Sequence, residues 1–370
     1  MNLKSTAIKP DQIPNLGYSP ALDGLRAIAV ILVMLTHANF QLGDNGVLGV
    51  DMFFALSGFL ITTLLLEENS KRQGISLAAF YVRRGLRLFP ALYITLAVAL
   101  LYAFYVKDGV EQTKIIWEVA SASLYLYNIS WIWDWNGPLL GHTWSLAVEE
   151  QFYLIWPWIL IFALRFKALR LLALGLTGFI ALSYVLKLTG NLSGLGRSLI
   201  HEAIFIGCLA SILRWTGKLP FRIPDIIILG CLIFTVIVGV FPVTWYMELY
   251  KQGGGSLMAL ITAIIILGLV DQSSSLTSKL LGLPPLIGIG KISYALYLWH
   301  VPVFHWFKWH STLPPSVSFI LKFVITFLLA GLSWVLVEKK ATRLGHTISK
   351  RLTNSRNMSK TIKTEIDVSN

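Results

Sequence analysis

An arginine and a histidine lie within one long apolar stretch near the N-terminus of the chain. Residues 21–42 (ALDGLRAIAVILVMLTHANFQL) contain Arg26 and His37. An ionisable side chain in the hydrocarbon region of a bilayer is costly, so both are candidate site residues. On a straight helix their spacing returns to nearly the same direction, with the side chains about 16 Å apart along the axis. They could therefore line one path at two depths without touching.

A pair of carboxylates opens a later apolar stretch. Glu149 and Glu150 follow His142 in the segment HTWSLAVEEQFY. On a helix, His142, Glu149 and Tyr153 share one face. Two carboxylates at the mouth of a span, without a matching lysine nearby, are hard to explain by packing. Alternatively, the two glutamates form an exposed pair at the membrane interface that contributes little to stability.

The composition indicates an integral membrane protein. Hydrophobic residues make up 55% of the chain and charged residues 14%, and the mean hydropathy is +0.66. An average soluble domain carries nearly twice that share of charged residues. The net charge of +12 fits basic residues that face an anionic inner leaflet. We therefore expect the lipid bilayer as a partner, and no nucleic acid.

Ten apolar stretches are long enough to cross a bilayer, which needs about 20 residues. The sequence thus predicts an all-α membrane protein, a bundle of about ten transmembrane helices, with nine or eleven as alternatives. The stretches are 22–42, 49–66, 86–106, 143–164, 169–188, 198–215, 224–242, 255–270, 286–306 and 317–337. Most Lys and Arg fall on one side of this arrangement, which predicts that both termini are cytoplasmic.

The predicted organisation has three parts. A cytoplasmic segment, 1–20, precedes a membrane domain, 21–345, and a cytoplasmic tail, 346–370, which is polar and expected to be disordered. Within the membrane domain, residues 113–135 either lie in the interface plane or re-enter the bilayer. No disulfide or metal site is expected, because Cys208 and Cys231 both fall inside predicted spans.

Five motifs occur in order along nearly the whole chain, and together they resemble the acyltransferase-3 family of membrane acyltransferases. They are LDGLR at 22–26 with His37, GVDMFFALSGF at 49–59, FYVRRGLRLFP at 80–90, HTWSLAVEEQFY at 142–153 and SYALYLWH at 293–300. The expected tail after the membrane domain is short, so we expect the stand-alone type of this family, without the esterase-like domain that some members carry.

The resemblance implies an O-acetyltransferase that moves an acyl group to a carbohydrate hydroxyl. The usual donor is acetyl-CoA, which binds on the cytoplasmic side as a substrate, so no permanently bound cofactor is expected. The acceptor is met on the outer side. Acceptors in the family include O-antigen, exopolysaccharide, peptidoglycan and macrolide sugars. The expected location is a bacterial inner membrane or plasma membrane.

Four arginines are predicted to bind the donor. Arg26 lies at the inner end of the first span, beside Arg83, Arg84 and Arg87. Guanidinium groups bind phosphate oxygens in a bidentate manner, so the four together form a plausible receptor for the phosphates of coenzyme A. Alternatively, the last three serve only to keep this loop cytoplasmic.

The outer ends of three spans are predicted to carry the chemistry. His37 would be the general base, or would briefly carry the acyl group, because imidazole titrates near neutral pH. A carboxylate, Glu149 first and Asp51 second, would hold its tautomer and stabilise the imidazolium; Glu150 belongs to the same candidate site. Alternatively, His37 is a polar contact between helices, and Asp51 only caps the second helix.

Two further residues have competing interpretations. Ser57 is interpreted as a small residue at a helix contact rather than as a nucleophile. His300, near Tyr294 and Tyr297, is either part of a site wall or an interfacial belt residue. The competing function for the whole chain is a transporter or flippase, which ten spans with a charged stripe would also fit. Ionisable residues that cluster at the two faces and not at the midplane argue against it.

Overall fold

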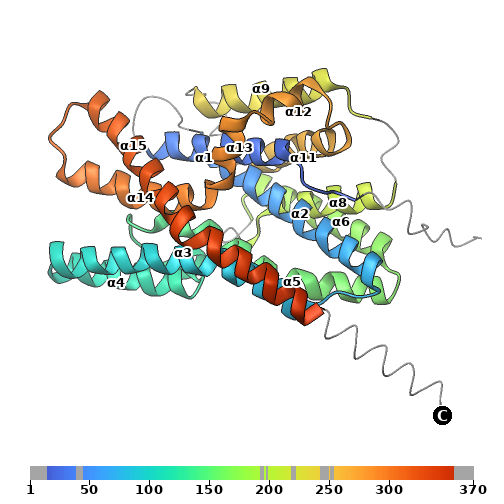
Figure 1. The fold of residues 1–370 in the computed structure, drawn as a ribbon, viewed down its shortest axis with the longest axis horizontal. Coiled ribbons are helices and arrows are strands. Elements are labelled where there is room, and N and C mark those ends of the chain that lie inside the picture. The colour runs from blue at the N-terminus through green and yellow to red at the C-terminus, as the bar shows by residue number, and fades with distance from the viewer. Residues whose placement is uncertain are drawn as a thin grey trace, which may run out of the picture.

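The fold is seen in a computed structural model, which describes residues 15–38, 45–191, 196, 199–217, 222–241, 250 and 254–353. Every regular element in this part of the chain is helical, as the apolar stretches predict. Figure 1 shows the helices packed around α1 and α2. In chain order the elements are α1 (Pro20–His37), α2 (Val47–Arg72), α3 (Leu77–Val106), α4 (Gly109–Ser123), η2 (Tyr127–Trp133), η3 (Gly141–Thr143), α5 (Trp144–Arg165), α6 (Leu169–Leu188), α8 (Glu202–Trp215), α9 (Asp225–Val240), α11 (Gly255–Asp271), α12 (Leu276–Leu281), α13 (Pro284–Lys291), α14 (Ser293–His310), α15 (Pro315–Ser333) and the π-helix η5 (Trp334–Glu338).

Six described helices are long and apolar enough to cross a membrane. They correspond to the first five predicted spans and the last one, and they lie at Pro20–His37, Val47–Arg72, Leu77–Val106, Gly141–Arg165, Leu169–Leu188 and Pro315–Thr353. Helices α9 and α11 are apolar but shorter. The predicted span at 286–306 is divided at Ile292 into α13 and α14. The total of ten spans and the cytoplasmic placement of both termini stay predictions.

Helix α1 is held by close backbone contacts on two sides. A Cβ atom added to Gly49 of α2 would lie 2.2 Å from the carbonyl oxygen of Ala29. One added to Gly290 of α13 would lie 1.9 Å from the carbonyl oxygen of Asp23. Glycine allows helices within a membrane to approach this closely. The helix that carries Arg26 and His37 is therefore fixed against its neighbours.

Helix α4 runs back along the second half of α3, side by side with it in Figure 1. Gln112 near its start donates to the carbonyl oxygen of Ala103 at 3.3 Å, and its last residue, Ser123, accepts from the hydroxyl of Tyr93 at 3.2 Å. The first part of the segment 113–135 is thus a helix antiparallel to α3. Element η2 follows it and leads the chain towards α5.

The last long helix extends beyond the predicted membrane domain. It runs from α15 through the π-helical segment η5 and ends at Thr353. Residues 346–353, predicted to begin a disordered tail, are helical instead. Ser349 and Thr353 are buried, and the Ser349 hydroxyl accepts from Arg83, which holds this end of the helix to α3. The division into three parts stays a prediction. Residues 354–370 lie outside the described part of the chain.

Candidate functional site

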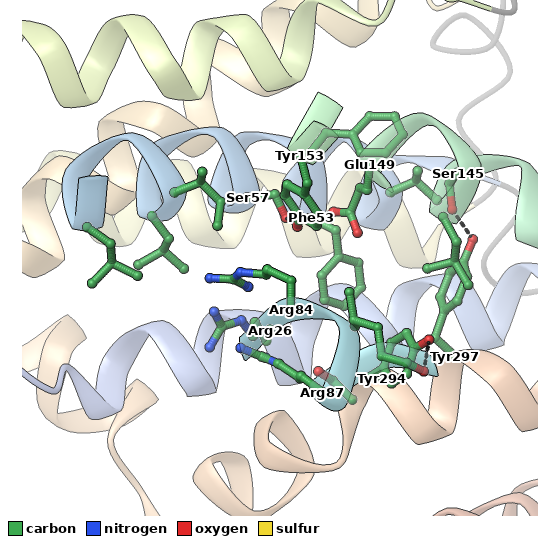
Figure 2. A pocket seen from close by; sticks show the side chains of 18 of the residues that line it. Arg26, Phe53, Ser57, Arg84, Arg87, Ser145, Glu149, Tyr153, Tyr294 and Tyr297 are labelled. Atoms are coloured by element: carbon green, nitrogen blue, oxygen red, sulfur yellow. Dashed lines mark hydrogen bonds between the residues drawn. The ribbon is translucent and has the colours of Figure 1, made fainter. Parts of the chain in front are cut away.

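Three of the four predicted arginines meet at one end of a cavity of about 220 Å³ (Figure 2). Arg26 comes from α1, and Arg84 and Arg87 come from one face of α3. Arg26 Nη1 donates to Oδ1 of Asp23 at 2.8 Å, and the hydroxyl of Tyr18 donates to the other oxygen of Asp23 at 2.9 Å. Asp23 is not among the predicted site residues, although its i,i+3 spacing from Arg26 is a signal for this pair.

A second and wider cavity, about 890 Å³, adjoins the arginine end of the first. Arg26, Arg84 and Arg87 line both cavities, whereas Arg83 lines only the wider one. Arg83 pairs with Glu68 at 3.2 Å and also donates to the Ser349 hydroxyl. It is therefore engaged in holding α3 to α2 and to the last helix. The remaining lining residues of the wide cavity include Lys71, Arg72, Lys291 and Lys339.

A hydroxyl and a carboxylate meet in the middle of the narrow cavity. Glu149 lies between the arginine end and the Ser145 end in Figure 2, and its Oε1 accepts from Ser57 Oγ at 2.6 Å. The hydroxyl of Tyr153 donates to the same Ser57 oxygen at 2.9 Å. The Arg84 guanidinium lies 5.4 Å from the centre of the Tyr153 ring. Ser57, interpreted as a packing residue, is thus part of the cavity wall.

The second carboxylate of the pair has a different environment. Oε1 of Glu150 is buried and has no hydrogen-bond partner among the described residues. Its electrostatic neighbours are Glu149 and Arg84. Glu150 is not among the residues that line the narrow cavity. The two adjacent glutamates therefore do not act as a matched pair in this structure.

A tyrosine and a serine close the far end of the narrow cavity. The Tyr297 hydroxyl lies 2.6 Å from Ser145 Oγ and donates to the carbonyl oxygen of His142 at 2.8 Å. Its ring centre is 5.4 Å from the ring centres of both His142 and His300. The end wall of the cavity therefore packs directly against a group of histidines.

Three histidines from three helices form this group. The ring of His300 is 5.0 Å from that of His37 and 5.1 Å from that of His142, nearly edge-on to both. His142 and His300 are buried, whereas His37, at the end of α1, is exposed. His142 was predicted only as part of a motif, and His300 either as a site wall or as a belt residue. The structure places both beside the predicted base. Among the described residues, no group of three or more His, Cys, Asp or Glu could hold a metal ion.

The hydrogen bonds of His37 differ from those expected. Its Nδ1 is 2.9 Å from the carbonyl oxygen of Val33 and 3.4 Å from Nε2 of His300. The predicted orienting group, Glu149, is bonded to Ser57 instead. Within the described part of the chain, a backbone carbonyl and a second imidazole thus occupy the position expected for a carboxylate.

Asp51 lies in a separate polar cluster. Its neighbours are Lys187 and Glu202, which form an ion pair with each other, and it hydrogen-bonds to Tyr250. The interpretation of Asp51 as a helix cap is wrong, because the N-cap of α2 is Gly46. Its backbone position, in the second turn of α2, is too far into the helix to cap it.

A buried carboxylate outside the candidate spans organises the loop that precedes His142. Glu118 of α4 accepts from the backbone amides of Leu140 at 2.6 Å and Leu139 at 3.4 Å, and from the Tyr127 hydroxyl at 3.3 Å. Burial raises the pKa of Glu118 to about 7, although both amides oppose the shift. Sequence reasoning missed this residue, because the two amides that it accepts from lie more than 20 residues away along the chain.

Comparison with known proteins agrees with the motifs. A family model described as an acyltransferase domain matches residues 19–336. The chain belongs to the acyltransferase-3 family. It is 32% identical over 356 residues to the peptidoglycan O-acetyltransferase OatA of Listeria monocytogenes, covering 89% of this chain and 56% of that protein. It is 31% identical over 352 residues to the O-acetyltransferase OatA of Staphylococcus aureus, covering 89% of this chain and 58% of the relative. The chain thus spans rather more than half the length of these relatives. No solved structure matches it.

Proposed function

We propose that this protein is a membrane O-acetyltransferase that moves an acetyl group from acetyl-CoA to a carbohydrate hydroxyl. One observation carries the proposal. A single cavity joins three arginines at one end to the Ser145–Tyr297 wall at the other, and the histidine group packs against that wall. The candidate phosphate receptor thus lies at one end of the cavity, and the candidate base lies beyond the wall at its other end.

The arginine end fits the phosphates of the donor. Arg26, Arg84 and Arg87 converge where the two cavities meet. Guanidinium forks match phosphate oxygens in geometry and charge. We assign the wide cavity to the nucleotide part of acetyl-CoA, on the cytoplasmic side, and the narrow one to its pantetheine arm. Arg83 contributes charge to the wide cavity, while its ion pair with Glu68 holds the helices around it.

The histidine end fits the proton transfer. A carbonyl oxygen only accepts hydrogen bonds, so the short contact to Val33 places a proton on Nδ1 of His37 and leaves Nε2 free to act as the base. In the reaction, the acceptor hydroxyl gives its proton to Nε2 and its oxygen attacks the thioester carbonyl. The carbon–sulfur bond then breaks, and the thiolate of coenzyme A takes the proton from His37.

The acceptor is proposed to approach from outside. His37 is exposed at the end of α1 opposite to Arg26. Peptidoglycan is the acceptor class with the most support, because the Listeria monocytogenes relative is a peptidoglycan O-acetyltransferase; exopolysaccharide and O-antigen are other carbohydrates of the same chemistry. We place the protein in the cytoplasmic membrane with this end facing the cell wall.

A labelling experiment tests the proposal. His305, on α14 with its ring against that of Trp309, lies outside the histidine group and provides a control. Membranes that contain wild-type protein, His37→Ala or His305→Ala are incubated with acetyl-radiolabelled acetyl-CoA and peptidoglycan fragments, and the glycan is extracted. We expect base-labile label with the wild type and the control and none with His37→Ala at equal protein abundance. Equal labelling by His37→Ala would remove His37 from the mechanism. Solute flux without dependence on CoA, in place of labelling, would support a transporter.

A further inference from the structure

His300 lies in the middle of α14 with both ring nitrogens in hydrogen-bonding range of other groups. It is 0% exposed. Its Nδ1 is 2.6 Å from the carbonyl oxygen of Tyr297, one turn earlier, and its Nε2 is 3.4 Å from Nδ1 of His37. The ring is held from the sides as well, since His142 and Phe304 both pack edge-on against it, at 5.1 Å and 5.9 Å. A side chain fixed at every edge is suited to orient its neighbour.

The two backbone carbonyls determine the tautomers of both rings. Because the Tyr297 carbonyl can only accept, Nδ1 of His300 carries its proton and Nε2 has the lone pair. Because the Val33 carbonyl can only accept, Nδ1 of His37 also carries its proton. The contact between the rings therefore has a direction. His37 Nδ1–H donates to both the Val33 carbonyl oxygen and His300 Nε2.

We propose that His300 is a positioning residue for His37. Its Nε2 accepts a hydrogen bond from Nδ1–H of His37 and thereby keeps the His37 ring turned so that Nε2 of His37 faces the exposed side. The same hydrogen bond stabilises the imidazolium that forms when His37 takes the hydroxyl proton. This inference rests on the proposed function. It gives His300 the part that Glu149 or Asp51 was expected to play.

A neutral partner fits this location better than a carboxylate. His300 is buried within a bundle of apolar helices, where an ionised side chain is costly. His300 accepts a hydrogen bond without carrying a charge in the resting state. The proton does not pass to His300, because its Nδ1–H is held by Tyr297 and a second proton would place a full charge on a completely buried ring. The hydroxyl proton therefore stays on His37 Nε2 until the thiolate takes it.

Two substitutions separate positioning from packing. His300→Leu replaces the imidazole with an apolar side chain of similar bulk and so removes the hydrogen-bond acceptor. His300→Gln places an amide oxygen, which can accept a hydrogen bond, near the position of Nε2. We expect His300→Leu to lower kcat by about 10- to 100-fold, the range for losing a hydrogen bond to a charged group. The KM for acetyl-CoA stays unchanged, because the arginines are untouched. His300→Gln is expected to recover most of the lost kcat.

A histidine on the same helix provides the matched control. His305→Leu, on α14 but outside the histidine group, should leave kcat unchanged. Full kcat in His300→Leu, beside wild-type activity and an inactive His37→Ala, would overturn the inference and leave the proposed function intact. Equal loss in the Leu and Gln variants, with a lowered unfolding temperature, would also overturn it, since that is a packing effect. An inactive wild type would overturn the proposed function, and the role of His300 with it.

Discussion

Ser57 Oγ donates a 2.6 Å hydrogen bond to Glu149 Oε1, and both residues line the narrow cavity. The serine also accepts from Tyr153, so its proton and one of its lone pairs are engaged. A hydroxyl held in this way between a carboxylate and a phenol is a fixed part of the wall, and an acyl group that passes from the arginines towards His37 must pass beside it.

The first prediction concerns this wall. Ser57→Ala should lower kcat by less than about tenfold, because it removes one hydrogen bond from Glu149 and no reacting group. Ser57→Leu adds bulk to a cavity of about 220 Å³ and should raise the KM for acetyl-CoA much more strongly. Steady-state kinetics with acetyl-CoA as the varied substrate measures both. Inactivity of Ser57→Ala in folded protein would instead indicate a nucleophile.

The arginines should differ in their importance to donor binding. Arg84→Ala and Arg87→Ala should each raise the KM for acetyl-CoA by about 10- to 100-fold, because each removes a charged partner of a phosphate. Replacement by lysine should recover only part of this, since lysine lacks the bidentate fork.

Arg83→Ala is the matched control for that series. Arg83 lines only the wider cavity and is paired with Glu68. We expect a small change in KM and a lower unfolding temperature in detergent. A change in KM as large as that of Arg84→Ala would contradict the division between the two cavities.

A buried lysine next to the histidine group should support the end of α1. Lys322 of α15 donates to the carbonyl oxygen of Ala38 at 3.1 Å and lies 5.7 Å from the centre of the Phe304 ring. A cation near the last carbonyls of a helix is stabilising. Lys322→Met keeps the length of the side chain and removes the charge. It should lower kcat severalfold and the unfolding temperature by a few degrees, measured by differential scanning fluorimetry.

The stability of the protein should depend on pH through Glu118. Its pKa is raised by burial to about 7, above the ordinary value of 4.5. The folded state therefore binds this proton more tightly than the unfolded state, and stability falls as the pH rises from about 4.5 to 7 and is then constant. The total fall in the free energy of unfolding over this pH range is at most about 3 kcal/mol.

Glu118→Gln keeps an acceptor for the amides of Leu139 and Leu140 and cannot ionise. Its unfolding temperature should lack the decline that the wild type shows between pH 5 and 7. If both proteins show the same decline, Glu118 is not the group responsible. The comparison is made in detergent with no substrate present, so it does not depend on the proposed activity.

Charged residues in apolar stretches were the part of the site that could be predicted from the sequence. Arg26, Arg84 and Arg87 stand out against their neighbours, and the motifs group them correctly at one end of a cavity. The helical fold followed from apolar length alone. In contrast, the contact between His37 and His300 joins residues 263 positions apart, and no local spacing indicates which face of α14 meets α1.

The remaining differences have the same origin. Glu149 is bonded to Ser57, and not to His37, because α2 packs against α5 at that level. The predicted span at 286–306 divides because the chain bends at Ile292 between α13 and α14. Both results depend on how helices meet in three dimensions, and the periodicity of one segment does not contain that information.

The glycine contacts along α1 bear on how two substrates can meet. With Gly49 on one side and Gly290 on the other, α1 lies against the backbones of both neighbours, which restricts tilting and sliding. A carrier that moves its cargo by rocking one set of helices against another needs such freedom. We therefore expect α1 to act as a fixed divider, with Arg26 near its start and His37 at its end. Coenzyme A and the glycan would each stay in its own compartment, and only a two-carbon fragment would travel between them.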